Sequence, residues 1–305
     1  MGNTVKSKRG QPILSIIIVS YNTADLIGDC LKSVFAASNI TKEIFVVDNA
    51  STDNSVILVE KDFPEVNVIV NMKNRGFAAA NNQVIPLYKG KYIFFLNPDA
   101  KVMQDTFNKA ILFMYTNPDT GLAGTKVVYP DGTFQWSVSN KYPGEKYTTN
   151  ELCELPGSIA CVLGASMIAR SELIKGLKGF DEDFFLYGED QDLCLRIRKS
   201  GYKIGYTDSA RIIHLGGQSE KNSLSSEVWE KKINAEYIFY RKHYLPKTIN
   251  RINRSNTIKA LWRIITLKLF LPFAKDKTRM KEKLGKYRVI YYAVKNPIHQ
   301  NSEKK

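Results

Sequence analysis

Short, uninterrupted apolar runs alternate with helix-type patterns along the first hundred residues, and this alternation constrains the fold most. Residues 13–20 read ILSIIIVS, residues 43–47 read EIFVV and residues 91–96 read KYIFFL, while residues 66–70 form one more strand pattern. Continuous apolar, β-branched runs are typical of parallel strands that are buried on both faces. Because helical patterns separate these runs, the chain is predicted to form an α/β fold around a mainly parallel sheet.

Further along the chain the pattern is less regular. We predict a helix over residues 76–87, a strand over residues 164–169 and a helix over residues 188–200 that Gly201 closes at its carboxyl end. Beyond Leu122 the remaining segments give no clear period. The sequence therefore defines the first half of the sheet better than the second half.

The charge is concentrated in the tail. Residues 241–305 hold 18 Lys and Arg against 3 Asp and Glu, whereas the preceding residues hold 26 against 27. A neutral body argues against nucleic acid as a partner, and a basic tail favours a polyanion bound by the tail alone. We therefore expect a polar segment at residues 1–12, a catalytic domain at 13–245 and a basic amphipathic tail at 246–305.

The cysteines and the amino-terminal residues indicate the cellular compartment in which the protein is expected. Cys30, Cys153, Cys161 and Cys194 form no CxxC motif, which favours reduced thiols in a cytoplasmic protein. Residues 1–12 are polar and basic, so no secretory signal is expected there. No GxGxxG motif follows the first strand, which argues against a dinucleotide-dependent oxidoreductase.

Polar residues stand where the predicted strands end. Tyr21 and Asn22 follow the first strand, Asp48 and Asn49 follow the second, and Asn97-Pro98-Asp99 follows the fourth. Ligands of open α/β sheets bind beyond the carboxyl ends of the strands, so these side chains are expected to line one crevice. Asp48 can equally cap the following turn, and Asn97-Pro98-Asp99 alone can be an Asx-capped turn.

Three acids, Glu189, Asp190 and Asp192, crowd the start of the helix predicted over residues 188–200. Acids at a helix amino terminus interact favourably with the helix dipole, which accounts for one or two of them. The preceding Phe184-Phe185-Leu186-Tyr187 is apolar and aromatic. Because an apolar setting raises the pKa of a carboxyl group, this cluster is a candidate for general-base chemistry.

Two basic side chains are further candidates. His214 precedes Gly216-Gly217, and contact with a metal or a diphosphate is weighed against a satisfied core histidine. Arg75 opens the helix predicted over residues 76–87, where it can contact phosphate with help from the helix amino terminus. Neither residue is decisive alone.

At these residues the chain resembles glycosyltransferase family 2, in particular its bacterial rhamnosyltransferase-like branch. The matching stretches follow one another in a consistent order: residues 15–22, 46–53, 74–77, 96–99, 179–182 and 188–193. The resemblance implies a GT-A fold and a metal-dependent, inverting hexosyltransferase. Asn97 stands where a full DxD motif has its first Asp. Since the motif then lacks one acidic metal ligand, His214 is a candidate for the second metal contact.

The resemblance also implies roles for the candidate residues. Asp190 is expected to be the general base, with Glu189 beside it, and Asp99 is expected to bind Mg²⁺ or Mn²⁺ together with His214. The residues expected to bind the nucleotide-sugar are Tyr21, Asn22, Asp48, Asn49, Arg75 and Asn97. The expected donor is dTDP- or UDP-linked, with L-rhamnose as one candidate sugar. The expected acceptor is a lipid-linked or polysaccharide chain of a cell-surface glycan. The alternative is a catalytically silent sugar-nucleotide-binding partner, against which Glu189-Asp190 argues.

The tail shows an amphipathic pattern. Five apolar residues fall on one helical face: Ile258, Leu261, Trp262, Ile265 and Leu269. Lys259 and Arg263 lie away from that face, and the apolar stretch is shorter than the roughly 20 residues that a spanning helix needs. We expect this helix to lie on an anionic membrane surface at the inner face of the cell membrane, and the alternative is a helix packed on the body.

Overall fold

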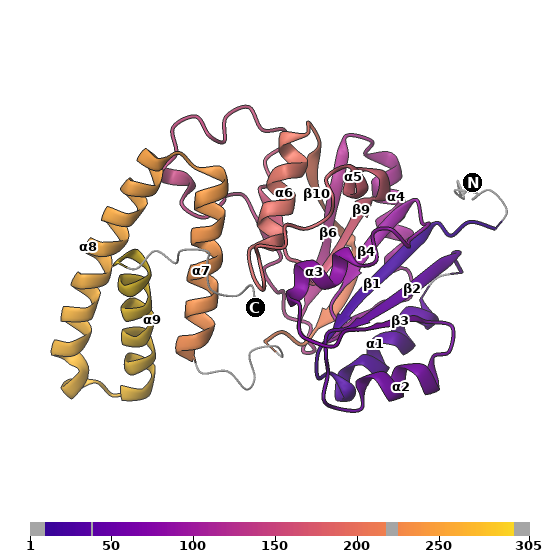
Figure 1. The fold of residues 1–305 in the computed structure, drawn as a ribbon, viewed down its shortest axis with the longest axis horizontal. Coiled ribbons are helices and arrows are strands. Elements are labelled where there is room, and N and C mark those ends of the chain that lie inside the picture. Colours follow the sequence, from indigo (N-terminus) through magenta and orange to yellow (C-terminus); the bar gives the residue numbers. More distant parts are fainter. Residues whose placement is uncertain (1–9, 38, 218–224, 296–305) are drawn as a thin grey trace. The chain divides into compact units, whose positions relative to one another are not determined.

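The computed structural model describes residues 10–37, 39–217 and 225–295, so most of the expected segment 1–12 lies outside this description. The chain divides into two compact units (Figure 1). Of the described residues, the sheet unit comprises 10–37, 39–142, 155–185 and 189–217, and the helical unit comprises 143–154, 186–188 and 225–295. Both units are therefore built from segments that are discontinuous in the sequence.

An eight-stranded sheet forms the sheet unit. Its strands are β1 (Leu14–Ser20), β2 (Lys42–Asp48), β3 (Asn67–Val70), β4 (Tyr92–Leu96), β5 (Ala100–Val102), β6 (Thr120–Val128), β9 (Ser166–Arg170) and β10 (Lys203–His214). They lie in the order β3-β2-β1-β4-β9-β6-β10-β5. Only β9 and β5 run antiparallel to their neighbours, which confirms the predicted mainly parallel α/β architecture. The short strands β7 (Val138–Ser139) and β8 (Cys161–Val162) pair separately.

Helices pack on the sheet as the strand alternation requires. The helices of this unit are α1 (Ala24–Ala36), α2 (Ser55–Asp62), α3 (Gly76–Asn82), α4 (Thr106–Thr116), α5 (Ser171–Gly176) and α6 (Glu189–Lys199). Ile16 and Phe94 share one core cluster with Ile27 of α1 and Phe107 of α4. Phe95 points to the opposite face, where its ring meets Phe180 at 4.9 Å. The sheet is thus covered on both faces.

Two expectations about elements were wrong or incomplete. The predicted helix 76–87 ends at Asn82, because Pro86 lacks an N–H and disfavours helical geometry in the residue before it. In the irregular second half, β6 and β10 pair in parallel through a register shift between Thr207 and Arg211. The shift inserts extra residues into β10, so a bulge interrupts the two-residue period of that strand.

The helical unit contains α7 (Ser225–His243), α8 (Pro246–Phe270) and α9 (Lys277–Lys295), with the 3₁₀ turns η1 (Glu145–Tyr147) and η3 (Leu271–Phe273). Tyr237, Tyr240 and Tyr244 are buried, and neighbouring rings lie 5.3 and 5.7 Å apart. These tyrosines therefore belong to the packing of the helical unit. Thr248 donates a hydrogen bond to Glu151, which ties the 143–154 segment to α8.

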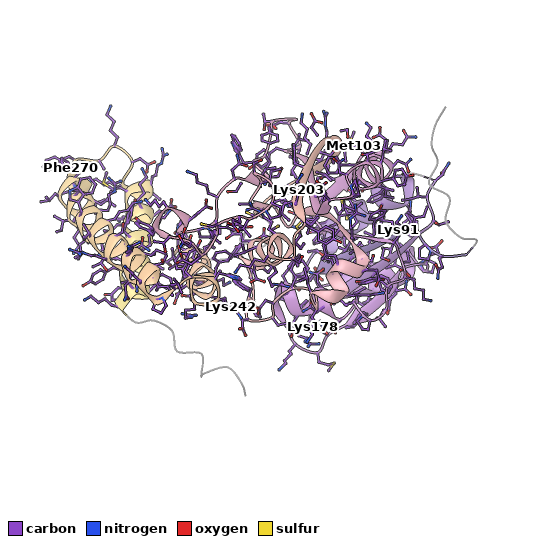
Figure 2. All side chains as sticks on the ribbon, turned by 90° about the horizontal axis from the view of Figure 1, so that it is seen from above. Lys91, Met103, Lys178, Lys203, Lys242 and Phe270 are labelled. Atoms are coloured by element: carbon purple, nitrogen blue, oxygen red, sulfur yellow. The ribbon has the colours of Figure 1, made fainter. Side chains whose placement is uncertain are left out.

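The apolar face of α8 is exposed. Ile258, Trp262 and Ile265 are each about 60% exposed, whereas Ala260 and Leu267 on the other side of the helix are buried. Figure 2 shows Phe270 at the end of α8, and its side chain is also exposed. Within residues 10–37, 39–217 and 225–295, no helix combines the length and the apolar character needed to cross a membrane.

Candidate active site

The carboxyl ends of four parallel strands carry the predicted polar residues. Asp48 ends β2, His214 ends β10, and Asn97 directly follows β4. Asn49 N–H donates to the carbonyl of Ser20, the last residue of β1, at 2.7 Å. Since these strands are parallel, all of these residues lie at the same edge of the sheet.

Asp48 is buried, and only one of its two carboxylate oxygens has a hydrogen-bond partner. Its Oδ2 accepts a hydrogen bond from Ser51 N–H at 2.9 Å, which is the turn cap that the sequence left open. Its Oδ1 is buried and has no hydrogen-bond partner. A buried acceptor without a partner costs about 1–3 kcal/mol, so this oxygen is suited to accept a hydrogen bond from a ligand. One carboxylate thus provides both a cap and a binding group.

Asn22 joins the loops that follow β1 and β2. Its backbone N–H donates to Ser51 Oγ at 2.9 Å, and its Oδ1 accepts from Thr52 N–H at 2.8 Å. Asn22 and Ala50 both have positive φ, 53° and 67°. Left-handed backbone at a residue such as Ala50 persists only where neighbouring contacts enforce it. The adjacent Tyr21 side chain is half exposed.

The Asn49 side chain is satisfied within the protein. Its Nδ2 donates to Asn74 Oδ1 at 2.8 Å, and its Oδ1 accepts from Asn71 Nδ2 at 3.1 Å and from Arg75 N–H at 2.9 Å. These bonds hold the loop between β3 and α3 against the end of β2. The Arg75 side chain is exposed at the start of α3.

Asp99 and His214 meet beside Asn97. His214 Nε2 lies 3.2 Å from Asp99 Oδ1 and 3.4 Å from Asn97 Nδ2. His214 Nδ1 lies 3.0 Å from Gln135 Oε1, and because that oxygen only accepts, the Nδ1 proton is directed to it. The second ring nitrogen therefore faces Asp99.

This pair suits a divalent cation. An imidazole lone pair and a carboxylate oxygen 3.2 Å apart require a positive species, a proton or a metal ion, to stabilise them. A histidine whose other nitrogen donates to a fixed acceptor is typical of metal ligands. Among the described residues, no group of three or more His, Cys, Asp or Glu could hold a metal.

Asp190 lies in the first turn of α6. Its Oδ2 accepts a hydrogen bond from Gly164 N–H at 3.2 Å, and its Oδ1 accepts from Gln191 N–H at 2.8 Å. Burial raises the pKa of Asp190 despite these bonds. Burial and the charge of Asp190 raise the pKa of Glu189, whose Oε2 has no partner.

The third acid of the cluster is structural. Asp192 is buried and accepts a 2.7 Å hydrogen bond from Arg196 Nε one turn later in α6. The aromatic segment before α6 contacts α3, because Phe77 N–H donates a hydrogen bond to the Phe185 carbonyl at 2.8 Å. Gly76 (φ 80°) leaves no room for a Cβ, which would lie 2.5 Å from that carbonyl oxygen.

Two residues of the site were not predicted. Gln135 orients His214, and Gly164 supplies a backbone N–H to Asp190, although residue 164 was placed at the start of a strand. Asn97 N–H donates to the Ala165 carbonyl at 3.0 Å, so the 164–165 segment joins the Asn97 and Asp190 clusters. No local motif marks a glutamine or a glycine for such roles.

Comparison with known proteins gives relatives in cell-surface glycan synthesis. The O-antigen biosynthesis protein RfbC of Myxococcus xanthus is 25% identical over 78% of this chain and 20% of its own length. The N-acetylglucosaminyl-diphospho-decaprenol L-rhamnosyltransferase of Mycobacterium tuberculosis (strain H37Rv) is 23% identical over 66% of this chain and 76% of its own length. This chain spans only 20% to 50% of the first three curated relatives.

Solved structures share the fold. The mannosyltransferase PcManGT from Pyrobaculum calidifontis, in complex with GDP-Man and Mn²⁺, has a TM-score of 0.60 at 17% identity and covers 96% of this chain and 89% of its own. TarS 1–349 of S. aureus, in complex with UDP-GlcNAc, has a TM-score of 0.55 at 17% identity and covers 94% and 93%. The fold is therefore GT-A-like, as predicted.

The family assignment rests on the sheet unit. The sequence profile of glycosyl transferase family 2 matches residues 15–177, which is more than half of the chain. The matched region contains Asp48, Asp99 and the strand ends that carry them. The chain belongs to glycosyltransferase family 2.

Proposed function

We propose that this glycosyltransferase moves a sugar, with inversion at the anomeric carbon, from a nucleoside diphosphate sugar to an acceptor hydroxyl. The observation that carries the proposal is the Asp190 carboxylate. Burial raises its pKa, while two N–H donors, from Gly164 and Gln191, fix its orientation. A carboxylate with a raised pKa is a better proton acceptor. Asp190 is also the residue at which the resemblance to glycosyltransferase family 2 implies the general base.

The donor is proposed to bind at the β1–β2 side. Asp48 Oδ1 is a buried acceptor without a partner, suited to the imide N–H of a pyrimidine base or to a ribose hydroxyl. Tyr21, Asn22 and Asn49 shape the loops around it, and the exposed guanidinium of Arg75 is available to the diphosphate. A dTDP- or UDP-linked donor matches a pyrimidine contact.

Asp99 and His214 are proposed to hold Mg²⁺ or Mn²⁺, with Asn97 beside them. The cation, when bound, neutralises charge on the leaving diphosphate. Imidazole favours Mn²⁺ over Mg²⁺, whereas a carboxylate accepts either ion. The Gln135 contact favours the tautomer of His214 in which Nδ1 carries the proton and Nε2 carries the lone pair that would bind the cation.

The proposed chemistry uses the residues of this chain for binding and proton transfer. Asp190 takes the proton of the acceptor hydroxyl as the acceptor oxygen forms a bond to the anomeric carbon. The bond from that carbon to the diphosphate oxygen breaks, and its electron pair leaves with the nucleoside diphosphate. Glu189 is buried beside Asp190, and burial together with the charge of Asp190 raises the pKa of Glu189, so the pair favours a single negative charge.

The acceptor is proposed to be a lipid-linked or polysaccharide chain of a cell-surface glycan, and L-rhamnose is the candidate sugar. The names of the Myxococcus and Mycobacterium relatives support both assignments. We propose a catalytic region at 13–245 and a tail at 246–305 that attaches peripherally to the inner face of the membrane. The exposed apolar face of α8 and its cationic neighbours support this attachment.

A ligand screen followed by a transfer assay tests the proposal. Thermal unfolding is followed with UDP-, dTDP- and GDP-sugars, each with and without Mn²⁺, because a ligand that binds the native state raises its unfolding temperature. We expect stabilisation by a pyrimidine nucleotide that is larger with Mn²⁺, and transfer to a lipid diphosphate acceptor. Stabilisation without any transfer or donor hydrolysis would support the catalytically silent partner instead. No stabilisation by any nucleotide-sugar would contradict both.

A further inference from the structure

A cavity of about 530 Å³ lies within the helical unit, where α8 ends and α9 begins. Trp262, Thr266 and Phe270 line it at four-residue spacing along α8, so their side chains follow one face of that helix. On α9, Arg279 and Lys283 line it with the same spacing. Residues of α8, of α9 and of the segment 274–276 between them thus line an open cavity that the proposed transfer reaction does not use.

Four cations line this cavity: Arg263, Lys275, Arg279 and Lys283. No salt bridge of the described residues involves any of them. The one acid in the lining, Asp276, uses its Oδ1 to accept a hydrogen bond from Arg279 N–H at 2.9 Å. The cavity therefore carries an excess of positive charge.

The same cavity is apolar and aromatic. Leu267 and Met280 line it together with Trp262 and Phe270, which are 61% and 62% exposed. The Arg263 guanidinium is held 5.6 Å from the Trp262 ring and 5.5 Å from the Tyr287 ring. Unpaired cations beside exposed apolar surface suit a ligand with an anionic head and an apolar chain.

We propose that this cavity binds the phosphate headgroup of one anionic phospholipid, with the acyl chain lying along Trp262 and Phe270. The inference rests on the proposed membrane attachment and deepens it, because it replaces a diffuse attraction of charges with one defined lipid site. The cavity is continuous with the exposed face of α8 through Trp262, which belongs to both. A second copy of the chain is disfavoured as the occupant, since it would bring like charges together.

Vesicle binding by matched charge variants tests the site. The full chain is sedimented with phosphatidylglycerol vesicles as wild type, as Arg279→Gln/Lys283→Gln, and as Lys268→Gln/Lys281→Gln. The second pair removes the same charge from α8 and α9, but neither residue lines the cavity. A defined site predicts that the cavity pair weakens binding at least about tenfold more than the matched pair, whereas a diffuse attraction weakens both alike. Equal losses would overturn the lipid site and leave the membrane attachment intact.

A soluble short-chain lipid separates the site from the membrane surface. Dihexanoyl phosphatidylglycerol, kept below its micelle concentration, is expected to raise the unfolding temperature of the wild type and of the matched pair, but not that of the cavity pair. Dihexanoyl phosphatidylcholine is the neutral control, and inorganic phosphate is the free-anion control. An equal shift with inorganic phosphate would show a free-anion site and overturn the lipid assignment. A lipid shift without vesicle sedimentation would instead contradict the proposed attachment alone.

Discussion

The β1–β2 side of the sheet edge carries the buried carboxylate of Asp48 and the β9–α6 side carries the half-buried carboxylate of Asp190, and the two groups are held differently. Asp48 ends a buried strand, and its Oδ2 is fixed by the turn at Ser51 while its Oδ1 has no partner. Asp190 accepts hydrogen bonds through both oxygens but lies beside Glu189 in a setting that raises the pKa of both acids. One environment favours a fixed acceptor for binding, and the other favours proton transfer. The same side chain thus acquires different roles from its neighbours.

Asp190→Asn tests the proton-transfer side and has the largest expected effect. We expect the transfer rate to fall about 10³-fold, because an amide cannot take the acceptor proton, whereas donor affinity stays within about threefold. Single-turnover transfer and donor titration measure the two quantities. Asp105→Asn, at an exposed acid paired with Lys109, is the control. Near-wild-type turnover of the Asp190 variant would remove the assignment as general base.

Asp99→Asn is expected to reduce transfer by about 10- to 100-fold, because it removes the one carboxylate of the proposed metal pair. The loss should be accompanied by a higher Mn²⁺ concentration for half-maximal rate. A Mn²⁺ titration of the initial rate measures both. If the variant kept the wild-type metal dependence, the cation would have to bind elsewhere.

Asp48→Asn probes the binding side. The amide keeps an acceptor for Ser51 N–H but places a donor where Oδ1 now lies, so the affinity for the nucleoside diphosphate should fall about tenfold. The rate at saturating donor should change little, since the residue is proposed to act in binding. Calorimetric titration with the nucleoside diphosphate gives the affinity. A large loss of rate with unchanged affinity would contradict the assignment of Asp48 to donor binding.

Glu189→Gln has the smallest expected effect and concerns stability. The pKa of Glu189 is raised in the folded state, so the folded protein binds its proton more tightly than the unfolded chain does. Stability is therefore lost as the pH rises above the unfolded pKa, until the pH passes the folded value. The neutral amide should raise the free energy of unfolding by about 1–3 kcal/mol at pH 8 and leave it unchanged near pH 4.

Urea unfolding at the two pH values measures this difference. Asp192→Asn on the same helix is the matched control, and it should destabilise the protein because it weakens the 2.7 Å contact with Arg196. A destabilised Glu189→Gln variant at pH 8 would show that the charged form has a partner in the folded protein.

Much of the fold could be predicted from local pattern. The first four parallel strands and the helices beside them each carry a continuous apolar or amphipathic signal, and the structure places them in neighbouring positions. A strand was predicted at residues 164–169, where β9 lies, but the strand order of the second half was not predicted, because β9 inserts antiparallel between β4 and β6 and β10 carries a register shift. The order and direction of strands that are distant in the sequence are not encoded in the local hydrophobic period of either strand.

The sequence by itself determined the residue types at the strand ends: Asp48, Asn97, Asp99, Asp190 and His214 each stand next to a readable strand or helix boundary. Only the tertiary structure decided which of them meet. Asp99 and His214 are 115 positions apart and come within 3.2 Å because β5, which begins directly after Asp99, pairs antiparallel with β10 and places Ala100 opposite His214. Gln135 and Gly164 act on His214 and Asp190 through contacts that chain folding alone creates. Burial, which raises the pKa of Asp190, is likewise a property of packing, since it depends on neighbours that are distant in the sequence.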